Sequence, residues 1–188
     1  MSKLLIVYGT TDGHTRRIAL RIADVAGEYG HTPYVVDAAT RPVLARSDAD
    51  AVIVCAPIRK RRHPRSVVDF VRLNRRLLQH LPTAFFSVSL SVAGGDEKGP
   101  RKVLDAFVKE TGWHPSMVRL VAGALMYRKY GWLTKRMMQL IAWRAGGDTN
   151  TRHNYVYTDW EKLEKDVEEF LLAAVPAPWH EPATLVPA

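Results

Sequence analysis

Cysteine is nearly absent from this chain of 188 residues, which contains Cys55 alone. A single thiol forms no internal disulfide, so the composition favours a reducing, cytoplasmic compartment. Long apolar runs are also missing: no stretch reaches the roughly 18 apolar residues that a membrane-spanning helix needs. The opening MSKLLIVYG is too short for a secretory signal, so we expect none. Any contact with a membrane is therefore expected to be peripheral.

Acidic residues are scarce relative to basic ones, with 19 Asp and Glu against 27 Lys and Arg, a formal charge of +8. This excess favours an anionic partner, such as lipid head groups, nucleic acid or an acidic small molecule. Aromatic residues are not interleaved with the basic run, and no nucleic-acid-binding module is visible, so we expect no nucleic-acid partner. The histidines lack the paired spacing of metal ligands, and we expect no metal.

Two common phosphate-binding motifs are missing as well. The loop YGTTDGHT (8–15) has no Lys followed by Ser or Thr, as a P-loop requires, and no G-x-G-x-x-G pattern. Its hydroxyl groups and glycines nevertheless lie between an apolar, strand-like run and a helical pattern. Backbone N–H groups at a helix start bind anions, so the loop predicts a phosphate site of a nucleotide or flavin. The alternative is a strand-to-helix turn that is merely capped.

The sequence does contain a regular alternation of strands and helices. Apolar runs of strand length lie at 3–8, 32–38, 50–56, 83–90 and 118–125. Helical periodicity follows the first loop up to Gly30, and recurs at 67–78 and 97–111. Such alternation predicts an α/β fold with a parallel sheet and helices on both faces.

The end of the chain departs from this alternation. Residues 126–153 interrupt it before a short strand and a last helix, whose start has the capping-box spacing of Thr158 and Glu161. We interpret 126–153 as an insertion within a domain that spans 1–175. The proline-rich tail 176–188 is expected to be extended or disordered.

Specific motifs along residues 3–170 resemble one family. They are TTDGHT, API followed by Arg59 and His63, AFFSVSL, AGALMYRKYGW, and GGDTNTR followed by VYTDWE. The chain resembles the flavodoxin-like family of menaquinone-dependent protoporphyrinogen IX dehydrogenases. The resemblance implies a five-stranded sheet of order 2-1-3-4-5 that binds FMN. It also implies oxidation of protoporphyrinogen IX to protoporphyrin IX, with electrons passed to menaquinone or ubiquinone at the inner face of the cell membrane.

The resemblance also implies positions for the cofactor. Phosphate is assigned to the first loop, which consists of Thr10, Thr11, Asp12, Gly13, His14 and Thr15. The ring is assigned to two strand ends, namely Pro57, Ile58 and Arg59, and Ser87, Val88, Ser89 and Leu90. A carboxylate would repel phosphate, so we expect Asp12 to turn back and cap the following helix. No catalytic acid or base stands out.

Two basic segments are candidates for substrate and membrane contact. In RKRRHPR (59–65), the residues Arg59, Arg61, Arg62 and His63 are expected to meet the two propionates of protoporphyrinogen. The alternative is a solvated loop. In 126–145, apolar side chains alternate with cations, which suits a membrane interface or ordinary packing. Its candidate residues are Arg128, Lys129, Trp132, Lys135, Arg136 and Arg144.

Two other functions stay open at this point. One is an FMN electron carrier or soluble quinone reductase, although carriers of the flavodoxin type are generally acidic and compact. The other is a non-enzymatic module that binds a membrane or a protein. A homo-oligomer is compatible with all of these readings.

Overall fold

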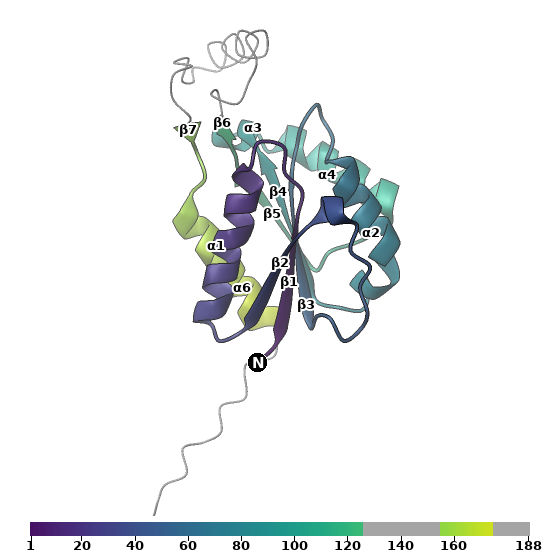
Figure 1. The fold of residues 1–188 in the computed structure, drawn as a ribbon. Coiled ribbons are helices and arrows are strands. Elements are labelled where there is room, and N and C mark those ends of the chain that lie inside the picture. Colours follow the sequence, from purple (N-terminus) through teal and green to yellow (C-terminus); the bar gives the residue numbers. More distant parts are fainter. Residues whose placement is uncertain (126–154, 175–188) are drawn as a thin grey trace, which may run out of the picture.

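The computed structural model describes residues 1–125 and 155–174. Five parallel strands form its main sheet, in the order β2-β1-β3-β4-β5 (Figure 1). They are β1 (Lys3–Tyr8), β2 (Thr32–Asp37), β3 (Ala51–Pro57), β4 (Thr83–Ser89) and β5 (Met117–Ala122). This arrangement confirms the predicted flavodoxin-like fold class and strand order.

Helices cover both faces of the sheet (Figure 1). On one face lie α1 (His14–Glu28) and α6 (Trp160–Ala174), and on the other α2 (Arg65–Leu78) and α4 (Lys98–Thr111). Alternate strand residues therefore enter two separate cores: Leu4 and Ile6 of β1 pack toward α1 and α6, whereas Leu5 and Val7 pack toward α2 and α4. Burial on both faces explains why the strands read as continuous apolar runs.

Two short helices complete the main body. A 3-10 helix, η1 (Ala38–Thr40), follows β2, and α3 (Leu90–Ala93) follows β4. The sequence pattern predicted neither. Cys55 is fully buried in β3, as expected for a small apolar residue, and burial raises the pKa of its thiol.

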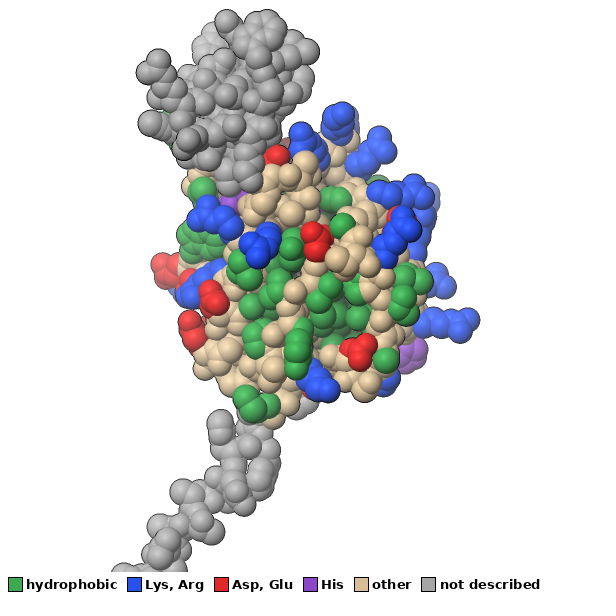
Figure 2. Space-filling view, in the orientation of Figure 1, with side chains coloured by type: hydrophobic (Ala, Val, Ile, Leu, Met, Phe, Trp, Pro, Cys, Tyr) green, Lys and Arg blue, Asp and Glu red, His purple; other side chains and the backbone are tan. Residues whose placement is uncertain are grey.

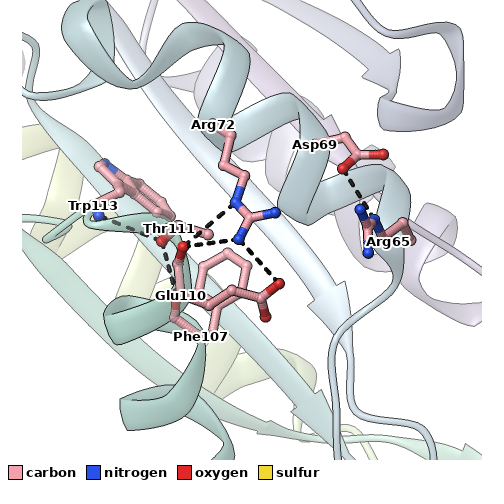
Figure 3. Close-up of polar contacts among 7 residues, drawn as sticks. All are labelled: Arg65, Asp69, Arg72, Phe107, Glu110, Thr111 and Trp113. Carbon is pink, nitrogen blue, oxygen red and sulfur yellow. Dashed lines mark hydrogen bonds and ion pairs between the residues drawn. The ribbon is translucent and has the colours of Figure 1, made fainter.

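Polar contacts join the middle of α2 to the C-terminal end of α4 (Figure 3). The Arg72 guanidinium donates to the Glu110 carbonyl oxygen at 3.2 Å and lies 3.3 Å from the Glu110 carboxylate. Beneath them, the Thr111 hydroxyl donates to the Phe107 carbonyl at 2.8 Å and accepts from the backbone N–H of Trp113. A depression of about 420 Å³ opens beside this contact. It lies at the edge of the sheet opposite the carboxyl ends of the strands.

The predicted strand 118–125 is in fact two strands. β5 ends at Ala122, and β6 (Ala124–Leu125) instead pairs antiparallel with β7 (Tyr155–Val156), forming a small ribbon. Gly123 separates the two, because its N–H donates to the Ser89 carbonyl at 3.0 Å. A Cβ atom at this position would come within 3.3 Å of the Leu90 nitrogen. Glycine therefore fits this close approach of the two backbones.

The predicted capping box at the last helix is wrong. The Asp159 carboxylate accepts from the Lys162 N–H at 2.9 Å and so caps α6, while Thr158 makes contacts elsewhere. The insertion 126–153, with its candidate residues from Arg128 to Arg144, and the tail 176–188 lie outside the described residues. None of the described helices is long and apolar enough to cross a membrane.

Candidate functional site

Three loops meet where the central strands end. Residues 9–13 follow β1, residues 58–64 follow β3, and α3 follows β4. Backbone hydrogen bonds join them: Gly9 N–H donates to the Cys55 carbonyl at 2.9 Å, and Ile58 N–H donates to the Val88 carbonyl at 2.7 Å. Gly9 also lies close to α2, where a Cβ atom would come within 2.5 Å of a methyl group of Val67, so only glycine fits without a shift of its neighbours. In open α/β sheets this edge is where ligands bind.

The loop after β1 is shaped for an anion. Gly13 is the N-cap of α1 with φ of 88°, a left-handed conformation that favours glycine. Its N–H donates to the Thr10 hydroxyl oxygen at 2.9 Å, which folds the loop over the helix start while leaving the Thr10 proton available to a ligand. The first N–H groups of α1 have no partner within the helix. These donors suit an anionic group of a ligand.

The predicted capping role of Asp12 is wrong, because Gly13 holds the N-cap position. The Asp12 carboxylate instead lies 3.6 Å from the Arg59 guanidinium, which comes from the loop after β3. The ion pair joins two of the three loops. It also offsets the repulsion between Asp12 and a bound phosphate.

His14 begins α1, but its side chain turns inward. It is 6% exposed and packs edge-on to the Trp160 ring of α6 at 6.1 Å. Its Nε2 lies 2.7 Å from the Thr158 hydroxyl oxygen. Burial, together with nearby Arg17, lowers the pKa of His14 to about 4. The ring is therefore neutral at pH 7, and the group that His14 offers to a phosphate is its backbone N–H rather than a cationic side chain. Thr15 is also buried, at 3% exposed.

The basic run after β3 forms a tight reverse turn. Arg59 and Arg62 exchange two backbone hydrogen bonds, of 2.9 and 3.1 Å. Lys60 and Arg61 form its tip, with φ of 49° and 60°. Left-handed backbone costs non-glycine residues energy and is often found at functional sites. All four side chains are exposed, so the turn presents a concentrated positive charge beside the anion-binding loop.

His63 follows the basic turn but lies apart from its exposed side chains. It is 4% exposed and contacts the rings of Phe85 and Phe107, both at 5.1 Å. Its Nδ1–H donates to the Pro57 carbonyl at 3.2 Å, and burial lowers its pKa to about 4. A neutral, buried ring adds no charge to the turn. Its predicted contact with a substrate stays a prediction that this burial disfavours.

The predicted ring-flanking residues at the end of β4 differ in how far they are buried. Ser87 and Val88 are buried, Ser89 is 7% exposed, and Leu90 is half-buried. The Ser89 hydroxyl caps α3 by accepting from Ser91 N–H at 3.3 Å. The Ser87 hydroxyl, by contrast, has no hydrogen-bond partner within the described part of the chain. Pro57 and Ile58 are half-buried at the neighbouring strand end, so both predicted flanks lie at the same edge.

One contact of the site escaped the sequence analysis. Thr158 lies 144 positions from His14, and its local pattern indicates only a helix cap. Nothing in the nearby sequence could have revealed this partner. Across residues 1–125 and 155–174, no group of three or more His, Cys, Asp or Glu side chains forms a candidate metal site.

Comparison with solved structures shows the same fold. Flavodoxin 1 from Bacillus cereus superposes with a TM-score of 0.56 at 18% identity, covering 92% of this chain and 99% of that one. The rubredoxin oxygen:oxidoreductase of Desulfovibrio gigas matches with a TM-score of 0.53 at 17% identity. In that case 92% of this chain aligns with 36% of the longer protein.

Comparison with sequences is more specific. The family model for a flavodoxin domain matches residues 5–152. Protoporphyrinogen IX dehydrogenase [quinone] of Escherichia coli K12 is 32% identical over 169 residues, which covers 89% of this chain and 93% of the relative. The Leishmania major protein of the same name is 32% identical over 177 residues, covering 93% and 76%. The chain therefore belongs to the family of flavodoxin-fold oxidoreductases that includes these protoporphyrinogen IX dehydrogenases.

Proposed function

We propose that this protein binds FMN at the carboxyl edge of its sheet and oxidises protoporphyrinogen IX to protoporphyrin IX, passing the electrons to a quinone. This activity would serve haem biosynthesis. The observation that carries the proposal is the pairing of Asp12 with Arg59, which places an anion-binding loop next to a cationic turn. When bound, the flavin supplies the redox chemistry, and the protein supplies binding, orientation and electrostatics.

Different residues of the chain would bind the phosphate and flank the ring. Gly13, Thr10 and the first turn of α1 offer N–H and O–H donors to the phosphate. Pro57 and Ile58 on one side, with Ser87–Leu90 on the other, would flank the ring. Neither His14 nor His63 adds positive charge to the site, because both rings are neutral at pH 7.

The cationic turn would bind the substrate. Protoporphyrinogen carries two propionates, and guanidinium groups bind carboxylates in bidentate fashion. Arg61 and Arg62 have exposed side chains for this purpose. Arg59 also faces Asp12, so a propionate at Arg59 would compete with that carboxylate.

We further propose that the protein is peripheral to an anionic membrane, where the quinone dissolves. Residues 126–145 support this by composition, since they combine Trp132 and Trp143 with several cations. Amphipathic segments of this kind bind anionic lipid surfaces. This would place the protein at the cytoplasmic face of the cell membrane.

The test is an anaerobic assay of the purified protein with protoporphyrinogen IX and a quinone in detergent. The parent protein should be yellow with bound FMN and should form fluorescent protoporphyrin IX. Arg61→Gln combined with Arg62→Gln should raise KM for protoporphyrinogen by about tenfold or more, because each charged hydrogen bond contributes roughly 1.5 to 3 kcal/mol. FMN content should not change.

The matched control is Arg76→Gln, which removes an exposed cation from the C-terminal end of α2, at the opposite edge of the sheet. It should keep the parent KM. A yellow protein that reduces quinone but never oxidises protoporphyrinogen would point instead to an electron carrier or quinone reductase. A colourless protein with neither activity would favour a non-enzymatic module.

A further inference from the structure

We propose that His14 and Thr158 are positioning residues that couple occupancy of the phosphate loop to the β6–β7 ribbon. This inference rests on the proposed binding of FMN at that loop. His14 opens α1 directly after Gly13, so its backbone is part of the predicted phosphate site. Thr158 comes directly after the ribbon and before α6. The contact between them links elements that are far apart in the chain.

Two sets of hydrogen bonds, joined through the backbone at Ala122–Gly123 and at Tyr157–Thr158, connect the two sites. From the loop, His14 Nε2 lies 2.7 Å from the Thr158 hydroxyl oxygen, and that hydroxyl donates to the Ala122 carbonyl at the end of β5, also at 2.7 Å. From the ribbon, Tyr157 N–H donates to the Gly123 carbonyl at 3.1 Å, and Gly123 N–H donates to the Ser89 carbonyl at 3.0 Å. The second set therefore ends at β4, beside the predicted ring site.

The directions of these bonds determine the state of the histidine. The Thr158 hydroxyl has one proton, which it donates to Ala122, so it accepts from His14. His14 therefore carries its proton on Nε2, and Nδ1 keeps a lone pair. Within the described residues, Nδ1 is buried without a hydrogen-bond partner. A buried polar atom without a partner is costly. Because Nδ1 has none, the bond from Nε2 to Thr158 is the hydrogen bond that holds the ring among the described residues, and the orientation of the ring depends on it.

Coupling of this kind is reciprocal. If a ligand at the loop holds His14 in place, it also steadies Thr158 and the ribbon. Conversely, loss of the Thr158 hydroxyl should weaken ligand binding at the backbone N–H groups of the loop, although Thr158 contacts the loop only through the His14 side chain. The ribbon should become more protected when FMN binds, although its residues are not assigned to the phosphate.

The test compares Thr158→Val, which removes the hydroxyl, with Thr158→Ser, which keeps it. FMN affinity, measured by fluorescence titration, should fall about fivefold to tenfold in the Val variant, the lower end of the usual range for coupling between two sites. The Ser variant should stay within twofold of the parent. FMN should slow hydrogen exchange at the Tyr157 N–H severalfold in the parent and Ser proteins, and not in the Val protein.

The matched control is Thr111→Val. Thr111 is also buried, at 3% exposed, and its hydroxyl also donates one hydrogen bond and accepts one (Figure 3). It is the last residue of α4, at the edge of the sheet opposite the phosphate loop. This variant should lose stability yet keep the parent FMN affinity. If Thr158→Val matches the parent in affinity and in exchange at Tyr157, the proposal is overturned. Equal weakening in Thr111→Val would also overturn it, because the effect would then reflect stability alone.

A measurement without FMN separates this inference from the proposed function. Nitrogen-15 NMR of the His14 ring should show the Nε2-protonated form in the parent and Ser proteins, and a mixture of both neutral forms in Thr158→Val. Exchange at the Gly13 N–H should be about tenfold faster in the Val protein alone. These results would uphold the pairing even if the parent bound no FMN.

If Thr158→Val cannot be purified, His14→Phe removes the same bond and should give the same weakening. Unchanged ring signals and Gly13 exchange would refute the coupling.

Discussion

At the scale of single residues, the two threonines of the phosphate loop differ in setting. Thr10 is half-buried and accepts from Gly13 N–H, whereas Thr15 is buried in the first turn of α1. Replacing both with Val keeps their shape and removes two hydroxyl donors. Each hydrogen bond to a charged group contributes roughly 1.5 to 3 kcal/mol, so FMN affinity should fall by at least about tenfold.

A fluorescence titration with FMN measures this loss. Thr83→Val serves as the control, because Thr83 is also buried but begins β4 at the opposite edge of the sheet. It should retain the parent affinity. Unchanged affinity in the Thr10 and Thr15 double variant would mean that the phosphate binds elsewhere.

The buried His63 predicts a specific loss of stability in acid. Its pKa falls from 6.5 in the unfolded chain to about 4 in the folded protein, because burial disfavours the charged ring. Between these values the unfolded state binds more protons, so the free energy of unfolding decreases as the pH falls through this window. From pH 7 to pH 5 this group alone should remove about 2 kcal/mol.

Urea unfolding at both pH values tests this effect. His63→Phe places an apolar ring against Phe85 and Phe107 and should reduce the pH-dependent loss by that amount. His114→Gln, a change at an exposed histidine, should leave the loss as in the parent. If His63→Phe keeps the full pH dependence, His63 is not the group responsible.

At the scale of elements, the turn 59–62 combines charge with backbone strain. Arg61 has φ of 60°, which a residue with a Cβ adopts at a cost of roughly 1 to 2 kcal/mol. Arg61→Gly and Arg61→Ala remove the same charge, but only glycine relieves the strain. The Gly variant should therefore be about 1 kcal/mol more stable than the Ala variant, as measured by urea unfolding.

The same pair separates charge from backbone shape in function. Both variants should weaken binding of protoporphyrinogen to a similar extent if the Arg61 cation contacts a propionate. A Gly variant that binds more weakly than the Ala variant would show that the rigid turn also contributes. Equal stability of the two variants would contradict the strained backbone.

At the scale of the whole molecule, charge is unevenly distributed. On the face seen in Figure 2, blue side chains gather along the upper and right-hand sides, while red ones are scattered over the left side, the centre and the lower right. If residues 126–145 dock on anionic lipid, replacing Lys135, Arg136 and Arg144 with Glu should release the protein from anionic vesicles. Each cation near such a surface contributes about 1 kcal/mol, and salt should weaken the binding.

Vesicle sedimentation at low salt, with quinone turnover measured alongside, tests this docking. The control replaces Lys98, Arg101 and Lys102 of α4 with Glu, which changes the net charge equally. That variant should still sediment with vesicles, and both variants should keep their FMN. If the α4 variant is released and the first is not, the main body rather than residues 126–145 binds the membrane.

The sequence by itself determined the layered fold and the position of the candidate site. Burial on both faces of a parallel sheet imposes continuous apolar strands, and the sequence shows such runs at 3–8, 50–56 and 83–90 without knowledge of any contact. The first loop is likewise recognisable from the sequence, because its hydroxyl side chains and glycines lie between a strand pattern and a helix pattern. Local pattern suffices there because the cause is local.

Only the tertiary structure decided the partners of individual polar side chains. Asp12 was expected to cap a helix and instead faces Arg59; Thr158 was expected to begin a capping box and instead binds His14, 144 residues away. His63 was expected beside the substrate and is buried against Phe85. A short polar side chain can bind its own backbone or a distant group. Which of the two it binds depends on the groups that the folded sheet brings within about 3 Å, and the residues next to it in the sequence do not determine that distance.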